Sequence, residues 1–181
     1  MPVVLLVHSD QMLKLGRTMA GIRDGVPKVL APAINRALAK GKTTVKREIR
    51  KDYTIKTGDI PVQIGRATRA SLKGVVVVND KMQDLVKFKN RGGTQFGNRR
   101  LPLHATVRKG RGGLIKSGFR ALKQLFIREG KSRLPIKKLL TIGAPIMASQ
   151  PAVGPAVIKD MGDTLDKRID HEIKRVMASA G

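Results

Sequence analysis

The sequence predicts an α+β fold with N-terminal helices, an antiparallel β-sheet of about four to six strands and a C-terminal amphipathic helix. Three patterns support this class. Apolar residues recur at helical spacing between Val26 and Ile49. Leu103, Ala105 and Val107 alternate with polar residues, as on a half-buried strand. A second helical stripe follows Pro155, and its members are Ile158, Met161, Leu165, Ile169, Ile173 and Val176.

The N-terminal part is predicted to be mainly helical. Residues 3–7 are apolar and suit a short strand, and Ser9 is positioned to cap a helix through about residue 23. The Gly25-Val26-Pro27 break restarts the chain as a helix that runs to about residue 52, with a basic outer surface. A short third helix is expected over residues 57–65.

The middle of the chain has the period of strands. Strands are expected at residues 70–78, 85–89 and 101–109, separated by glycine-bearing loops at 90–100 and 110–113. A turn or short helix over 117–123 then leads into a closing hairpin formed by 125–128 and 134–142.

The whole chain, residues 1–181, is predicted to form one domain with four successive parts. These are a helical part (9–65), a β-rich basic part (68–142), a linker punctuated by prolines (143–156) and the C-terminal helix (157–178). On that last helix, Asp163 and Lys167, like Asp170 and Lys174, have the i,i+4 spacing of acid-first ion pairs.

Positive charge is the strongest global signal. The chain has 37 Lys and Arg against 13 Asp and Glu, a formal net charge of +24. From Pro151 onward acids and bases cancel, whereas residues 85–138 hold sixteen basic residues and one acid, Glu129. Such a segment attracts polyanions or acidic proteins.

The residue types exclude several chemistries. There is no cysteine, hence no disulfide and no thiolate site. Gly41-Lys42-Thr43 lacks the upstream glycine of a P-loop and falls inside a helical period. His8, His104 and His171 have no metal-ligand partner at helical spacing. Asp163, Asp166 and Asp170 alternate with bases as solvated ion-pair partners do. The sequence therefore predicts no enzyme, no cofactor and no metal site.

Two Arg-Gly-Gly triplets, at 91–93 and 111–113, resemble fragments of RNA-binding segments. Because each lies between strand-like stretches, hairpin loops are the favoured interpretation. The basic residues of these loops still suit contact with phosphates or with an acidic protein. The candidate partner-facing residues are Lys89, Arg91, Arg99, Arg100, Arg108, Lys109 and Arg111.

An ordered set of short motifs follows the long basic helix. They are Tyr53-Thr54-Ile55-Lys56, Leu85-Val86-Lys87-Phe88, Gly118-Phe119-Arg120-Ala121, Leu125-Phe126-Ile127-Arg128 and Arg133-Leu134-Pro135-Ile136-Lys137-Lys138-Leu139, with Pro145 and Met147 beyond. This order resembles the Z-type minor tail protein family of lambda-like phages, over roughly residues 3–177 and most specifically over residues 119–147.

The resemblance implies a tail-completion or neck subunit of a tailed phage, made in the host bacterial cytoplasm and located in the virion. It implies a homo-oligomeric ring, a hexamer being favoured, that joins the tail terminator to the head-tail connector. Basic loops facing the ring axis would contact passing DNA without reading its sequence. The alternative is a basic nucleic-acid-binding module. No membrane partner is expected, because no apolar stretch approaches the roughly 20 residues needed to span a bilayer. Residues 3–7 are too short for a signal segment.

Overall fold

The structure is a computed structural model that describes residues 2–5, 16–18, 24–78, 82–96 and 99–179. The chain divides into two compact units, and each unit is built from segments that are not adjacent in the sequence. Unit 1 comprises residues 1–46, 62–78 and 149–181, and unit 2 comprises residues 47–61 and 79–148. Both units contain helix and strand, and the predicted α+β class is confirmed.

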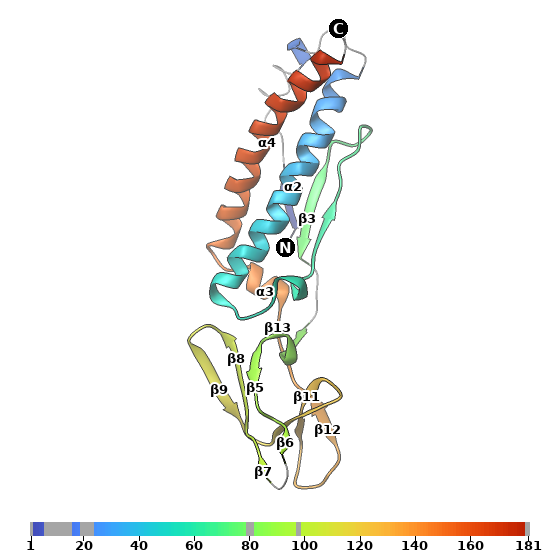
Figure 1. Cartoon of the computed structure of the whole chain (residues 1–181). Coiled ribbons are helices and arrows are strands. Elements are labelled where there is room, and N and C mark those ends of the chain that lie inside the picture. Colours follow the sequence, from blue (N-terminus) through green and yellow to red (C-terminus); the bar gives the residue numbers. More distant parts are fainter. Residues whose placement is uncertain (1, 6–15, 19–23, 79–81, 97–98, 180–181) are drawn as a thin grey trace. The chain divides into compact units, whose positions relative to one another are not determined.

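Among the described elements of unit 1, the long helix α2 (Gly25–Asp52) contributes the largest number of buried apolar residues to the core. The predicted stripe is buried at Leu30, Ile34, Ala37, Val45 and Ile49. A second buried row was not predicted, and it consists of Val29, Ala33 and Leu38. A helix that is apolar on two sides packs against two neighbours, and α2 lies between α4 and β3 in Figure 1.

The sheet of unit 1 has the strand order β1-β3-β2, with β1 (Pro2–Leu5), β2 (Val62–Gly65) and β3 (Gly74–Val78) all antiparallel. Alternate residues of β3 are buried, as expected for one face on a core. At the start of β3, a Cβ on Gly74 would lie 2.5 Å from Leu38 Cδ1. Glycine therefore allows this strand to lie directly on α2.

Helix α4 (Val153–Ala178) packs on the other side of α2. A Cβ on Gly41 would lie 2.4 Å from the sulfur of Met161, which is fully buried. One turn further along α2, the buried Thr44 hydroxyl donates a 2.7 Å hydrogen bond to Asp160. The two helices are therefore held in register by one close apolar contact and one partly buried polar contact.

The apolar stripe predicted for α4 has the correct helical period, but its first buried residues differ from the predicted one. Val153 and Val157 are buried with Met161, whereas Ile158 is 62% exposed. The expected pairs Asp163–Lys167 and Asp170–Lys174 are not among the ion pairs of the described helix. Glu172 instead pairs with Arg175 at 2.6 Å. Exposed long side chains gain little from pairing, so spacing alone does not decide which pairs form.

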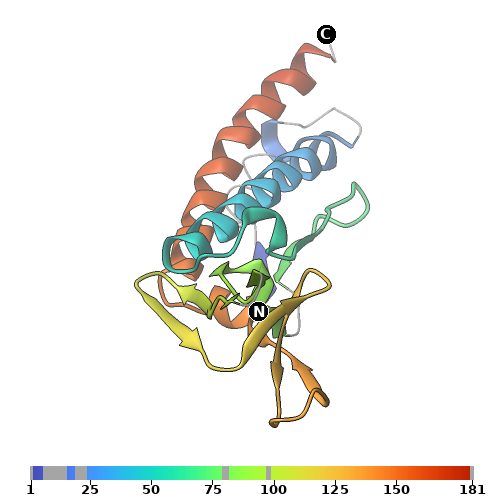
Figure 2. The same ribbon diagram turned by 60° about the horizontal axis from the view of Figure 1, so that its bottom comes forward.

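Unit 2 contains small antiparallel sheets in place of the single sheet of four to six strands that was expected. Strands β5 (Lys89–Arg91), β8 (Leu103–Arg108) and β9 (Arg111–Ile115) form one sheet, and β10 (Gly118–Ala121), β11 (Gln124–Arg128) and β12 (Ile136–Lys138) form another. Two-stranded pairs join β4 (Met82–Asp84) to β13 (Leu140–Gly143) and β6 (Gln95–Phe96) to β7 (Arg99–Arg100). Figure 2 shows these strands in green to orange.

The core of unit 2 is small and aliphatic. Leu85, Leu103 and Leu125 come from three different segments and pack together. Backbone hydrogen bonds tie two of these segments together through Leu139, since Leu85 N–H donates to the Leu139 carbonyl and Leu139 N–H donates to the Leu125 carbonyl. The closing hairpin was correctly predicted in its first part, where β11 pairs with β12. Its last part pairs with β4 instead.

Two predicted elements are wrong in type. Residues 57–65 form a 3-10 helix, Thr57–Asp59, followed by strand β2, because Pro61 lacks an N–H and disfavours helix before it. Residues 85–89 begin as a 3-10 helix, Leu85–Lys87, in which Phe88 N–H donates to the Leu85 carbonyl. This turn buries Leu85 and Phe88 together.

Four further expectations are corrected. Residues 111–113 of the expected loop belong to strand β9, and residues 118–121 of the expected turn form strand β10. The expected linker 143–156 contains the helix α3 (Ala144–Ala148), and α4 starts within it. In the 90–100 loop, β6 and β7 form a short hairpin. The Ser9 cap lies outside the described residues.

We predict opposite effects of alanine at two helical glycines. Gly41→Ala should lower the free energy of unfolding by about 1–2 kcal/mol, because the new methyl group overlaps Met161 by more than helix propensity compensates. Gly162→Ala is the matched control on α4. Its Cβ meets nothing within 4 Å, so it should stabilise by up to about 1 kcal/mol. Urea unfolding of the full chain measures both, and equal stabilisation would contradict the close approach of α2 and α4.

Candidate functional site

The candidate site is one face of the β5-β8-β9 sheet in unit 2. The register places Lys89 opposite Thr106 and Arg91 opposite His104. Because side chains alternate along a strand, these four residues share a face, and the neighbouring Leu103, Ala105 and Val107 turn toward the core. Gly112 of β9 lies opposite Thr106 on the third strand.

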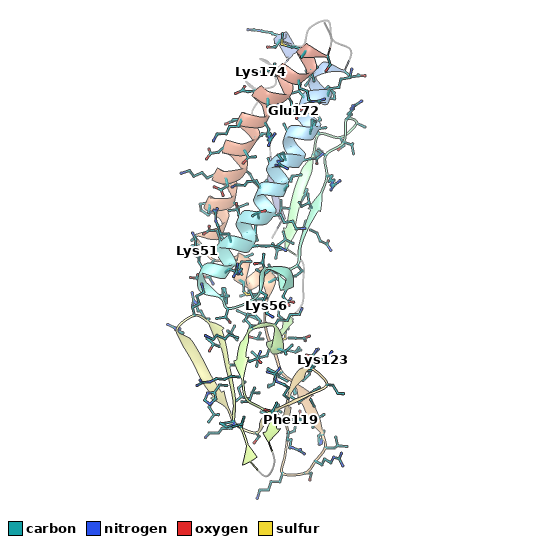
Figure 3. The ribbon with its side chains drawn as sticks, in the orientation of Figure 1. Lys51, Lys56, Phe119, Lys123, Glu172 and Lys174 are labelled. Carbon is teal, nitrogen blue, oxygen red and sulfur yellow. The ribbon has the colours of Figure 1, made fainter. Side chains whose placement is uncertain are left out.

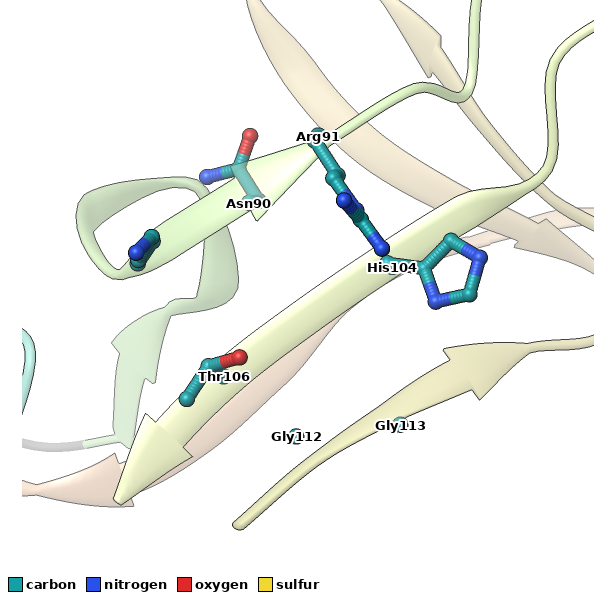
Figure 4. A pocket seen from close by; sticks show the side chains of 7 residues that line it. Asn90, Arg91, His104, Thr106, Gly112 and Gly113 are labelled. Atoms are coloured by element: carbon teal, nitrogen blue, oxygen red, sulfur yellow. The ribbon is translucent and has the colours of Figure 1, made fainter. Parts of the chain in front are cut away.

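A concavity of about 370 Å³ lies on this face. Figure 4 shows its lining, with Arg91 reaching from β5 toward His104 on β8. The lining residues are Lys89, Asn90, Arg91, His104, Thr106, Gly112 and Gly113. None of them is acidic, and none has a large apolar side chain.

The glycines of the two Arg-Gly-Gly triplets have different structural roles. Gly92 and Gly93 have φ angles of 74° and 75°, which glycine adopts without strain. They form the turn after β5, so the loop interpretation is correct for the first triplet. A Cβ on Gly112 would lie 2.3 Å from Thr106 Oγ1. Glycine at that position in β9 therefore keeps the Thr106 hydroxyl uncovered at the concavity.

No acidic side chain in the described part of the chain pairs with the basic residues of this face. Among the described residues, the side chains of Lys89, Arg91 and His104 have no hydrogen-bond or ion-pair partner. Both Lys89 and Arg91 are exposed. An uncompensated pair of cations beside a hydroxyl group has the chemistry that binds an oxyanion.

The structure separates the seven predicted partner-facing residues into three groups. Lys89 and Arg91 lie together at the concavity. Arg108, Lys109 and Arg111 are exposed at the turn between β8 and β9. The Arg108 guanidinium lies 5.9 Å from the Tyr53 ring centre, a cation–π contact. Arg99 and Arg100 form strand β7, and their side chains lie outside the described part of the chain.

Sequence reasoning missed His104, Thr106 and Gly112 as members of the site. The alternation along β8 already placed His104 and Thr106 on one face. The missing information was the register between β5 and β8, which pairs segments separated by the Gly92-Gly93 turn and the β6-β7 hairpin. The second triplet also concealed Gly112, because glycine is a poor signal for a strand.

The described residues contain no second candidate site beside this face. No group of three or more His, Asp or Glu side chains there is arranged to hold a metal ion. Gly41-Lys42-Thr43 lies inside α2, as predicted, so it is not a phosphate-binding loop. Among the helices that the structure describes, none has the length and apolar character of a membrane span.

Glu48 is a buried carboxylate near the end of α2, and it has a structural explanation. Lys51 Nζ lies 2.5 Å from Oε2 and Arg47 Nε lies 3.0 Å from Oε1. The hydrogen bond from Lys51 lowers the pKa of Glu48, with Arg47 adding to the effect against the cost of burial. Glu48 is thus a paired, ionised side chain.

Comparisons of the chain with protein-family models, with curated proteins and with solved structures found no match.

The lowered pKa of Glu48 predicts a pH-dependent contribution to stability. A carboxyl whose pKa is depressed by folding stabilises the protein above its unfolded pKa and loses that contribution as pH falls through the folded value. Glu48→Gln should therefore cost up to about 1 kcal/mol at pH 7, since both cationic partners are half exposed or more. The difference from wild type should shrink below about pH 4.5. Urea unfolding from pH 7 to 3 measures it, and a constant difference would refute the assignment.

Proposed function

We propose that this protein is a non-enzymatic structural subunit of a tailed-phage virion, acting in tail completion at the neck. It would join the tail terminator to the head-tail connector as a homo-oligomeric ring, with a hexamer favoured by the family resemblance. The ordered motifs centred on residues 119–147 support the assignment. On this proposal, the excess of basic residues serves contacts with neighbours and with passing DNA.

The first motifs of the most specific stretch of the resemblance, residues 119–128, lie in the β10-β11 hairpin of unit 2. Phe119 of β10 stacks on Phe126 of β11 with ring centres 5.9 Å apart, and the Arg128 guanidinium lies 5.2 Å from the Phe119 ring centre. Aromatic cross-strand pairs stabilise antiparallel ribbons. The motif residues thus build a stiff hairpin, which is a suitable support for a contact at its tip.

The tip of this hairpin is the structural observation that carries the proposal. Leu122 and Lys123 connect β10 to β11, with φ angles of 47° and 59°, and Leu122 is 91% exposed. Turns of this kind favour Asn-Gly, because other side chains strain the backbone there. Leu122 therefore lowers folding stability in two ways, through its strained backbone conformation and through its exposed apolar side chain. A contact with a neighbouring subunit would explain why such a residue is present there. Figure 3 labels Phe119 and Lys123 on this hairpin.

The alternative function is a basic nucleic-acid-binding module. The unpaired cations of the β5-β8-β9 face favour it, as does the net charge. Such a module would hold oligonucleotides at physiological salt without any tail component. It gives no reason for the exposed leucine at the hairpin tip.

The proposed function predicts binding to one end of the phage tail tube. Purified protein, mixed with tail tubes assembled without it, should add ring-shaped density at the head-proximal end and should be required for joining to heads. Negative-stain electron microscopy measures the first effect, and plaque-forming particles in a complementation extract measure the second. Unchanged tube ends, with tight oligonucleotide binding at physiological salt, would favour the alternative.

Substitution of the hairpin tip should raise folding stability and weaken assembly. Replacing Leu122 and Lys123 by Asn-Gly should raise the free energy of unfolding by about 1 kcal/mol, because both residues then suit the turn. The same double variant should bind tube ends at least tenfold more weakly. Lys123→Gly alone is the matched control, since it relieves strain but keeps Leu122. Undiminished binding by the double variant would show that the tip is not a contact.

A further inference from the structure

We infer that the concave face of the β5-β8-β9 sheet is a binding surface for the phosphate backbone of a nucleic acid, with Lys89 and Arg91 as the charged contacts. His104 and Thr106 lie beside them as polar hydrogen-bonding groups. The inference adds a defined binding site to the proposed function. It rests on that function only for the source of the nucleic acid.

The geometry provides a row of donors along one strand pair. Lys89 and Arg91 are two residues apart on β5, which separates their Cα atoms by about 6.5–7 Å. Each faces a polar residue of β8, Lys89 facing Thr106 and Arg91 facing His104. The row therefore extends along the strand direction and suits a linear polyanion.

The composition of the face distinguishes a nucleic acid from an acidic protein. Protein–protein interfaces have cores rich in aromatic and apolar side chains and poor in lysine. The concavity is lined only by basic, polar and glycine residues. Interfaces with nucleic acids are polar and strongly positive, and half or more of their hydrogen bonds go to phosphate and sugar.

The exposure of the face distinguishes a backbone from a small free anion. Sites for small ligands bury most of the ligand surface. Here Lys89, Arg91, Gly112 and Gly113 are all exposed, so a single phosphate would remain solvated. A polyanion instead gains from several contacts at once and from the release of its counterions.

The inference is tested by the salt dependence of binding to a fluorescently labelled 20-base-pair duplex, followed by anisotropy on the purified full chain. Lys89→Gln with Arg91→Gln should reduce the slope of log K against log salt by about 1.8, the value for two lost phosphate contacts. The charge-matched control is Lys131→Gln with Lys137→Gln. Both control residues are exposed, and they lie outside this sheet. Their replacement should leave the slope within about 0.5 of wild type.

Three results would overturn the inference. If both double variants lost the same amount of salt slope, the duplex would be bound by charge spread over the chain and not by this defined surface. Displacement of the duplex by inorganic phosphate at constant ionic strength would assign the face to small anions. Polyglutamate that binds as tightly as the duplex, and with the same dependence on Lys89 and Arg91, would assign it to an acidic protein. Tail-tube binding is measured separately, so loss of either proposal leaves the other standing.

Discussion

The close approach of α2 to neighbours on two sides is the constraint on which unit 1 depends. With few aromatic residues, the interior is built from aliphatic side chains, whose packing requires short distances between elements. Gly41 admits Met161 of α4 on one side, and Gly74 admits Leu38 at the start of β3 on the other. The partly buried Thr44–Asp160 hydrogen bond then fixes the register of the helices. A polar contact in such a core allows few alternative pairings.

Unit 2 is organised differently, because its apolar core is small and its charge is large. It contains 21 Lys and Arg against 6 Asp and Glu. Two of the acids are used inside the unit, where Glu48 pairs with Lys51 and Asp84 with Lys138. The remaining cations repel one another, and this weakens the compact state. An anionic partner that binds the folded form would stabilise the unit by linkage.

Both functional proposals concern features that are unfavourable for the isolated chain. The exposed Leu122 occupies a left-handed turn position. Lys89 and Arg91 share a face on which no acidic side chain of the described residues pairs with them. Features of this kind lower stability unless a partner uses them. Their different chemistry, apolar at the hairpin tip and cationic on the sheet, points to two different contacts on one unit.

The α+β class, the two long helices and the position of the excess charge could all be predicted from sequence patterns, which also named five basic residues of β5 and of the β8–β9 hairpin as candidates. Helical and strand periods and charge are local properties, so they can be read along the chain. Folding was needed to show that β10 is a strand, that Leu85 begins a 3-10 helix and that His104 and Thr106 lie beside Lys89 and Arg91. Those outcomes depend on partners distant in sequence, because register and burial arise when separate segments pair.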